Sequence, residues 1–92
     1  MHQDDKQLAR LYTLATEQGY ASAQFSLGGM YYEGEGVPQD NVYAHMWWSI
    51  AASTGDDRAK VKIKLVEEKM TTSDISEARR LAGERIKKNY KG

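Results

Sequence analysis

Few side chains in this sequence could perform chemistry, and they are scattered along it. The two histidines, His2 and His45, are far apart, and cysteine is absent. Zinc sites need histidine, cysteine or carboxylate ligands at short, recurring spacings, and covalent catalysis by cysteine needs a thiolate. We therefore expect no metal ion and no cofactor.

Acid–base catalysis would need a carboxyl group whose pKa is moved by burial or by a charged neighbour. The acidic residues of the C-terminal half are instead spaced along amphipathic stretches, as on solvated helix faces; they include Glu67, Glu68, Glu77 and Glu84. No arrangement of serine, histidine and acid typical of nucleophilic catalysis is visible. The sequence predicts that the protein is not an enzyme.

The glycine-rich stretch LGGMYYEGEGVPQD, residues Leu27 to Asp40, raises the question of a phosphate site. Phosphate-binding loops follow a strand, and the P-loop continues into Lys and then Ser or Thr. Here a helical pattern precedes the glycines, no lysine follows them, and two glutamates would repel an anion. We interpret the stretch as a connection between helices, in which Gly34 ends one helix in the left-handed conformation, Pro38 blocks its continuation and Asp40 caps the next.

Composition limits the remaining classes of function. The 92 residues suffice for one small domain, and thirteen basic residues balance thirteen acidic ones. Without a net positive charge, the chain has no field that would concentrate nucleic acid. It has no apolar run of about 18 residues that could cross a membrane, and its start lacks a secretory signal. We expect a soluble protein that binds no nucleic acid and does not insert into a membrane.

The sequence repeats itself at an offset of 50 − 14 = 36 residues. The matching pairs are Tyr12/Trp48, Leu14/Ile50, Ala15/Ala51, Gly19/Gly55, Ala23/Ala59 and Leu27/Ile63. This period is typical of helical repeat arrays, in which a helix pair buries its apolar face by stacking on its neighbours.

Apolar residues at the 3.6-residue period predict five helices and no strand. The first three helices end before Gly19, Gly34 and Gly55, and the fifth begins at Thr71, with Asp74 completing a capping box. The apolar stripe of the first predicted helix consists of Leu8, Leu11, Tyr12 and Ala15, and that of the second of Ala23, Leu27, Met30 and Tyr31. The stripe of the third consists of Val42 or Tyr43, Met46, Trp47, Ile50 and Ala51, and that of the fourth of Ala59, Val61 or Lys62, Ile63, Val66 and Met70. The stripe of the fifth consists of Ile75, Ala78, Leu81, Ala82 and Ile86.

The central segment AQFSLGGMYYEGEGVPQDNVYAHMWWSIAASTG resembles the Sel-one-like repeat, a relative of the tetratricopeptide repeat. The family pattern is present as Ala23, Leu27-Gly28, Tyr31, Gly34-Glu35-Gly36-Val37, Asp40, Ala44, Trp47, Ala51-Ala52 and Gly55. Tyr43 departs from it, since the family often has an acidic residue there, and the last unit lacks the Leu-Gly and Gly-x-Gly-Val elements.

The resemblance implies an all-α fold, a right-handed α-α superhelix (solenoid) of antiparallel helix pairs. Residues 1–92 would form one domain: 5–18 the second helix of a preceding repeat, 20–55 a complete repeat, and 56–90 a degenerate C-terminal repeat with a capping helix. The chain would then be the C-terminal portion of an array. The tail MTTSDISEARRLA is similar to the closing segment of many bacterial members, which implies a bacterial protein; the compartment, cytoplasm or periplasm, stays open.

A second stripe lies beside the packing stripe of the central repeat and consists of Phe25, Gly29 and Tyr32. Shifted by 36 residues, the first two positions become Val61 and Leu65, so an apolar strip would continue across neighbouring first helices. In tetratricopeptide-like solenoids this is the concave face, and an aromatic-lined groove suits a peptide. The same residues would be plain core if a short array curls over them.

The resemblance implies a non-catalytic adaptor or scaffold that binds a protein or peptide on its concave face. Two alternatives stay open: an enzyme or enzyme-associated domain acting on a cell-wall or small-molecule substrate, and a purely structural end of an array. The first helix would have no cover on its outer flank, where Leu14, with Ala9 beside it, is apolar. This flank predicts a homodimer through the N-terminal helix.

Overall fold

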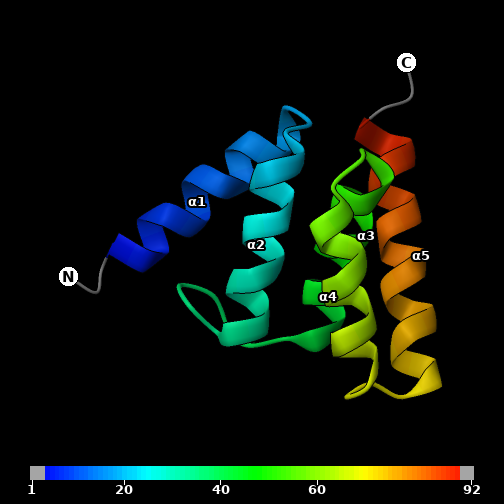
Figure 1. Cartoon of the computed structure of the whole chain (residues 1–92). Coiled ribbons are helices and arrows are strands. Elements are labelled where there is room, and N and C mark those ends of the chain that lie inside the picture. The colour runs from blue at the N-terminus through cyan, green and yellow to red at the C-terminus, as the bar shows by residue number, and fades with distance from the viewer. Residues whose placement is uncertain (1–3, 90–92) are drawn as a thin grey trace.

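The computed structural model describes residues 4–89, which form five helices and no strand. Their bounds are α1 Asp4–Glu17, α2 Ala21–Glu33, α3 Asn41–Ser53, α4 Asp57–Glu67 and α5 Thr72–Asn89. α2 to α5 run side by side, while α1 diverges from them at an angle (Figure 1). The predicted helix count and helical fold class are confirmed. Over the described residues, no helix combines the length and the apolar character needed to cross a bilayer.

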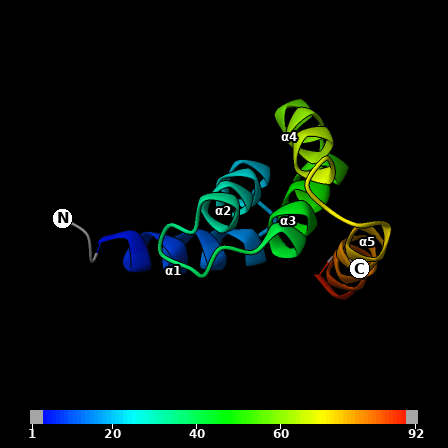
Figure 2. The same ribbon diagram turned by 90° about the horizontal axis from the view of Figure 1, so that it is seen from below.

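α3 lies at the centre of the array, with α4 on one side of it and α5 on the other (Figure 2). Its two adjacent tryptophans, about 100° apart around the helix axis, are both buried. Trp47 packs into a cluster with residues of α1, α2 and α5, including Leu27 and Ala82. Trp48 packs into a second cluster with α4, against Ala59 and Val66. One helix therefore supplies the large apolar group of both cores.

The helix boundaries are set by local hydrogen bonds that the sequence predicted. Gly34 ends α2 with φ 75°, and its N–H donates to the Met30 carbonyl at 2.7 Å. The Asp40 carboxylate accepts from the Tyr43 N–H at 3.0 Å and so caps α3. Thr71 Oγ1 accepts from the Asp74 N–H at 3.0 Å, and the Asp74 carboxylate accepts from the Thr71 N–H at 3.2 Å. The last pair is the predicted capping box.

The repeat offset is visible in the helices themselves. α2 begins at Ala21 and α4 at Asp57, so the two starts are 57 − 21 = 36 residues apart. Both helices pack against α3, which lies between them in the chain. Aligned positions in α2 and α4 therefore occupy equivalent places in the array.

The predicted packing stripe of α1 is confirmed for Tyr12, which packs against the core, and is wrong for Leu8 and Leu11. Leu8 is 43% exposed and Leu11 is 60% exposed, whereas Ala9, expected on the outer flank, is 5% exposed and belongs to the core. Thr16 is buried on the same side as Ala9. Both the predicted and the observed set of residues fit a 3.6-residue period. The side of α1 that faces the array combines the small Ala9 and Thr16 with Tyr12. Leu14 is exposed, at 59%, as expected.

Candidate protein-interaction surface

The two predicted groove aromatics, Phe25 and Tyr32, both lie next to Trp48. Phe25 and Tyr32 are half-buried on α2, and their ring centroids lie 6.5 Å and 5.6 Å from that of Trp48. The Trp48 indole N–H donates to the Phe25 carbonyl at 3.0 Å. The indole thus packs with residues of both α2 and α4. Phe25 and Tyr32 are partly buried against this apolar cluster and partly exposed at the surface.

The other three predicted groove residues lie at the surface. Val61 is 61% exposed and Leu65 is 48% exposed, both on α4. Gly29 of α2 faces open space, because a Cβ atom added there would meet no atom within 4 Å. We call these five residues the α2–α4 surface: Phe25, Gly29, Tyr32, Val61 and Leu65.

Two cations of the α4 segment cover the aromatic rings of α2, an arrangement that the sequence analysis missed. The Arg58 guanidinium lies 4.1 Å from the Phe25 ring centroid, and Lys69 Nζ lies 5.0 Å from that of Tyr32. Lys69 also donates to the Tyr32 hydroxyl at 2.8 Å, and this hydrogen bond is the main cause that raises the pKa of Lys69. Basic groups therefore flank the exposed aliphatic residues near both ends of α4.

Arg58 is held in place by the cap of α4. The Asp56 carboxylate accepts from the backbone N–H of Arg58 at 3.0 Å and from its Nη2 at 2.7 Å. The side-chain hydrogen bond from Arg58 is the largest cause that lowers the pKa of Asp56. The same carboxylate thus begins the helix and fixes the guanidinium over the Phe25 ring.

His45 is 1% exposed and has a partner on each ring nitrogen. Its Nε2 lies 2.7 Å from Glu67 Oε2, and its Nδ1 lies 3.1 Å from Ser49 Oγ. Glu67 was expected on a solvated face, but its side chain is 27% exposed and also lies 3.7 Å from Arg79 Nη2. The expectation for Glu67 was wrong because His45 lies on α3 and Glu67 on α4, and only the packing of these two helices brings the side chains together.

A serine, a histidine and a carboxylate in contact invite comparison with a catalytic relay. Acyl transfer also needs an accessible nucleophile and donors arranged for an oxyanion. His45 is buried, and Ser49 lies one turn further along the same helix, α3. The two pockets described for this chain are lined by other residues. The cluster is best explained as a buried histidine whose hydrogen bonds join α3 to α4.

Metal chemistry has no support in the described part of the chain. Among residues 4–89, no group of three or more histidine, cysteine, aspartate or glutamate residues could hold a metal ion. His2 lies outside the described residues.

The repeat and the five-helix fold have similar counterparts among known proteins. Residues 21–56 match the model of a family described as the Sel1 repeat. A similar solved structure is c5321, a protective antigen present in uropathogenic Escherichia coli strains and displaying an SLR fold. The two are 31% identical with a TM-score of 0.88 over 92% of this chain, which spans 18% of the length of that one. Residues 21–56 thus match the Sel1 repeat, and the five-helix arrangement of residues 4–89 is similar to a solved SLR fold.

Proposed function

We propose that this protein is an adaptor whose α2–α4 surface binds a peptide or a segment of another protein. The observation that carries the proposal is that Val61 and Leu65 are exposed on α4, on the same helix face as Arg58, whose guanidinium lies over the Phe25 ring. Burying exposed aliphatic and aromatic groups under a partner is favourable, at about 25 cal/mol for each Å² removed from water.

The neighbouring groups suit such a partner. Gly29 leaves room for a side chain or backbone to approach α2, and the cations Arg58 and Lys69 offer polar contacts at the edge of the apolar strip. Interfaces commonly combine an apolar centre with a polar rim. A non-catalytic role agrees with the use of the repeat family as scaffolds, and the buried His45 cluster gives no support to an enzymatic role.

We also propose that α2 and α3 form the complete repeat and that α4 and α5 form a degenerate unit.

We expect Val61→Ser with Leu65→Ser to weaken partner binding by about tenfold or more, because truncated central anchors typically cost more than 1 kcal/mol. Peptides selected from a random display library on the wild-type chain serve as probes. Their affinities are measured by calorimetry, and the amide shifts of the labelled chain locate the site. Both positions are exposed, so the helix content should not change.

The matched control is Lys60→Ser with Lys64→Ser, which alters two exposed residues of α4 outside the α2–α4 surface. This control should bind the peptides with nearly wild-type affinity. A library that yields no binder, or binders that both double variants hold equally well, would contradict the proposal.

We further propose that the chain self-associates through the leucine face of α1, which consists of Leu8, Leu11 and Leu14. At the 36-residue offset these positions correspond to residues of α3 that are all buried, namely Ala44, Trp47 and Ile50. The equivalent face of α3 is therefore covered by neighbouring helices, whereas on α1 this face is exposed. A second copy offering the same leucines would form a two-fold contact, the commonest closed arrangement.

Leu14→Glu is expected to shift any dimer towards monomer, because a carboxylate in the centre of an apolar contact must be desolvated. Sedimentation velocity over a concentration series measures the change. Thr13→Glu, on the neighbouring side of α1, adds the same charge outside the leucine face and should leave the association intact. A wild-type chain that stays monomeric at high concentration argues against this dimer.

A further inference from the structure

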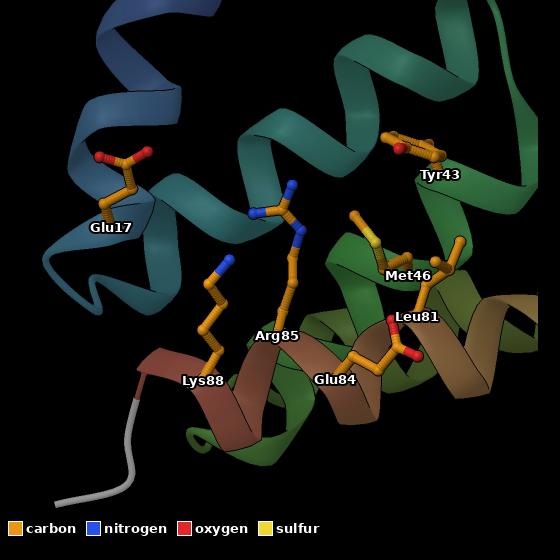
Figure 3. A pocket seen from close by; sticks show the side chains of 7 residues that line it. All are labelled: Glu17, Tyr43, Met46, Leu81, Glu84, Arg85 and Lys88. Atoms are coloured by element: carbon orange, nitrogen blue, oxygen red, sulfur yellow. The ribbon is translucent and has the colours of Figure 1, made fainter.

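A pocket opens between α1, α3 and α5, away from the α2–α4 surface. Its volume is about 450 Å³, within the usual range of about 300–1,000 Å³ for ligand pockets. The lining residues are Glu17 of α1, Tyr43 and Met46 of α3, and Leu81, Glu84, Arg85 and Lys88 of α5. Figure 3 shows Tyr43, Met46 and Leu81 gathered at one end, with Glu84 next to them, and Arg85, Lys88 and Glu17 towards the other end.

The polar centre of this pocket is Arg85. Its guanidinium lies 4.8 Å from the Trp47 ring centroid, so it is half-buried on an indole face. No carboxylate or other acceptor among the described residues forms an ion pair or hydrogen bond with it. A guanidinium carries five N–H donors in a planar fork that matches a carboxylate. The contact with the indole leaves the N–H donors of Arg85 without a hydrogen-bond partner among the described residues.

Neighbouring charges favour an anion at the same place. Lys88 stands one turn along α5 and also points into the pocket (Figure 3). Glu84 is already engaged by Arg80, whose Nη1 lies 2.7 Å from its carboxylate. Glu17, on the wall formed by α1, is the one lining carboxylate without a described ion pair, and it works against an anion.

We propose that this pocket binds a carboxylate joined to an apolar side chain, with the carboxylate on Arg85 and Lys88 and the apolar group against Met46 and Leu81. Both ends are needed, because the cations supply orientation and the methionine and leucine supply the apolar contact. Such a ligand is found at the C-terminus of a peptide that ends in an aliphatic residue, or as an acidic side chain next to one. The site is independent of the α2–α4 surface, from which α3 separates it.

The test uses three probes with the uniformly ¹⁵N-labelled chain: N-acetyl-alanyl-leucine, its C-terminal amide, and N-acetyl-glutamyl-leucine amide. We expect the first or the third to shift the Arg85 Nε–H and Trp47 indole N–H signals. The Trp47 indole N–H is buried and has no described acceptor, so it reports on Arg85 directly. The alanyl-leucine amide has no carboxylate and should bind about tenfold more weakly or worse. The probe that binds tells whether a terminal or a side-chain carboxylate is preferred.

Variants assign the effect to single charges. Arg85→Gln and Lys88→Gln should each weaken the binding of the carboxylate probes, whereas Glu17→Gln should strengthen it by removing the opposing charge. Lys87→Gln is the matched control, because this exposed lysine neighbours Lys88 but does not line the pocket. Should Arg85→Gln unfold the chain, the exposed Lys88 and Glu17 variants still decide the matter. Equal shifts from acid and amide, no shifts at all, or an effect of Lys87→Gln equal to that of Lys88→Gln would overturn the proposal.

Discussion

Trp48→Ala is expected to destabilise the protein by about 3–5 kcal/mol, the usual cost of removing a buried tryptophan side chain. Its indole is 2% exposed and joins α2, α3 and α4 in one apolar cluster. The change also removes the donor that bonds to the Phe25 carbonyl. Because native proteins have a total stability of about 5–15 kcal/mol, the variant should lose a large share of its free energy of unfolding.

Urea unfolding followed by circular dichroism measures this loss. Val61→Ala serves as the control, since an exposed residue on the same surface should change stability by no more than about 0.5 kcal/mol. A Trp48→Ala variant that loses less than about 1 kcal/mol, well below the range for such a truncation, would show that the indole is not the centre of this cluster.

The adjacent glycines Gly28 and Gly29 are expected to respond oppositely to alanine. A Cβ atom at Gly28 would lie 2.6 Å from two atoms of the Trp48 indole, whereas one at Gly29 would meet nothing within 4 Å. In mid-helix, alanine is more stable than glycine by about 0.5–1 kcal/mol. Gly29→Ala should therefore stabilise the chain. Gly28→Ala forces the indole or the helices apart, and overpacking of this kind costs about 1–3 kcal/mol.

The two single variants are compared by thermal and urea unfolding. Because both replace a glycine in the middle of α2 by alanine, the gain in helix propensity is the same in each and cancels in the comparison. A third measurement tests the cause: in the Trp48→Ala background, Gly28→Ala should no longer be harmful, because the atoms it would meet are gone. Residues in contact show coupling energies of about 0.5–3 kcal/mol. Equal effects of the two glycine substitutions, or strict additivity with Trp48→Ala, would rule out a close approach of Gly28 to the indole.

Local features of this fold could be read from the sequence because neighbours in the chain make them. Gly34 takes a positive φ that other residues avoid, and the caps at Asp40 and Thr71 bond to backbone groups three residues away. The 36-residue offset likewise predicted a solenoid of helix pairs. None of these depends on how the helices cross.

Contacts between helices could not be read in the same way. The 3.6-residue period allowed α1 to present either Leu11 or Ala9 to the array, and the packed position against α2 selected Ala9. The period also gave no reason to join His45 to Glu67, which come from different helices.

For the candidate sites the division is similar. The repeat offset alone placed Val61 and Leu65 in line with Phe25 and Gly29, because equivalent positions recur on equivalent helices. Only the tertiary structure laid Arg58 over Phe25 and opened a pocket at Arg85 between α1, α3 and α5. The physical reason is that a sequence period specifies which face of a helix is apolar, whereas the crossing and separation of helices decide which side chains from distant parts of the chain meet, and which remain open to a partner.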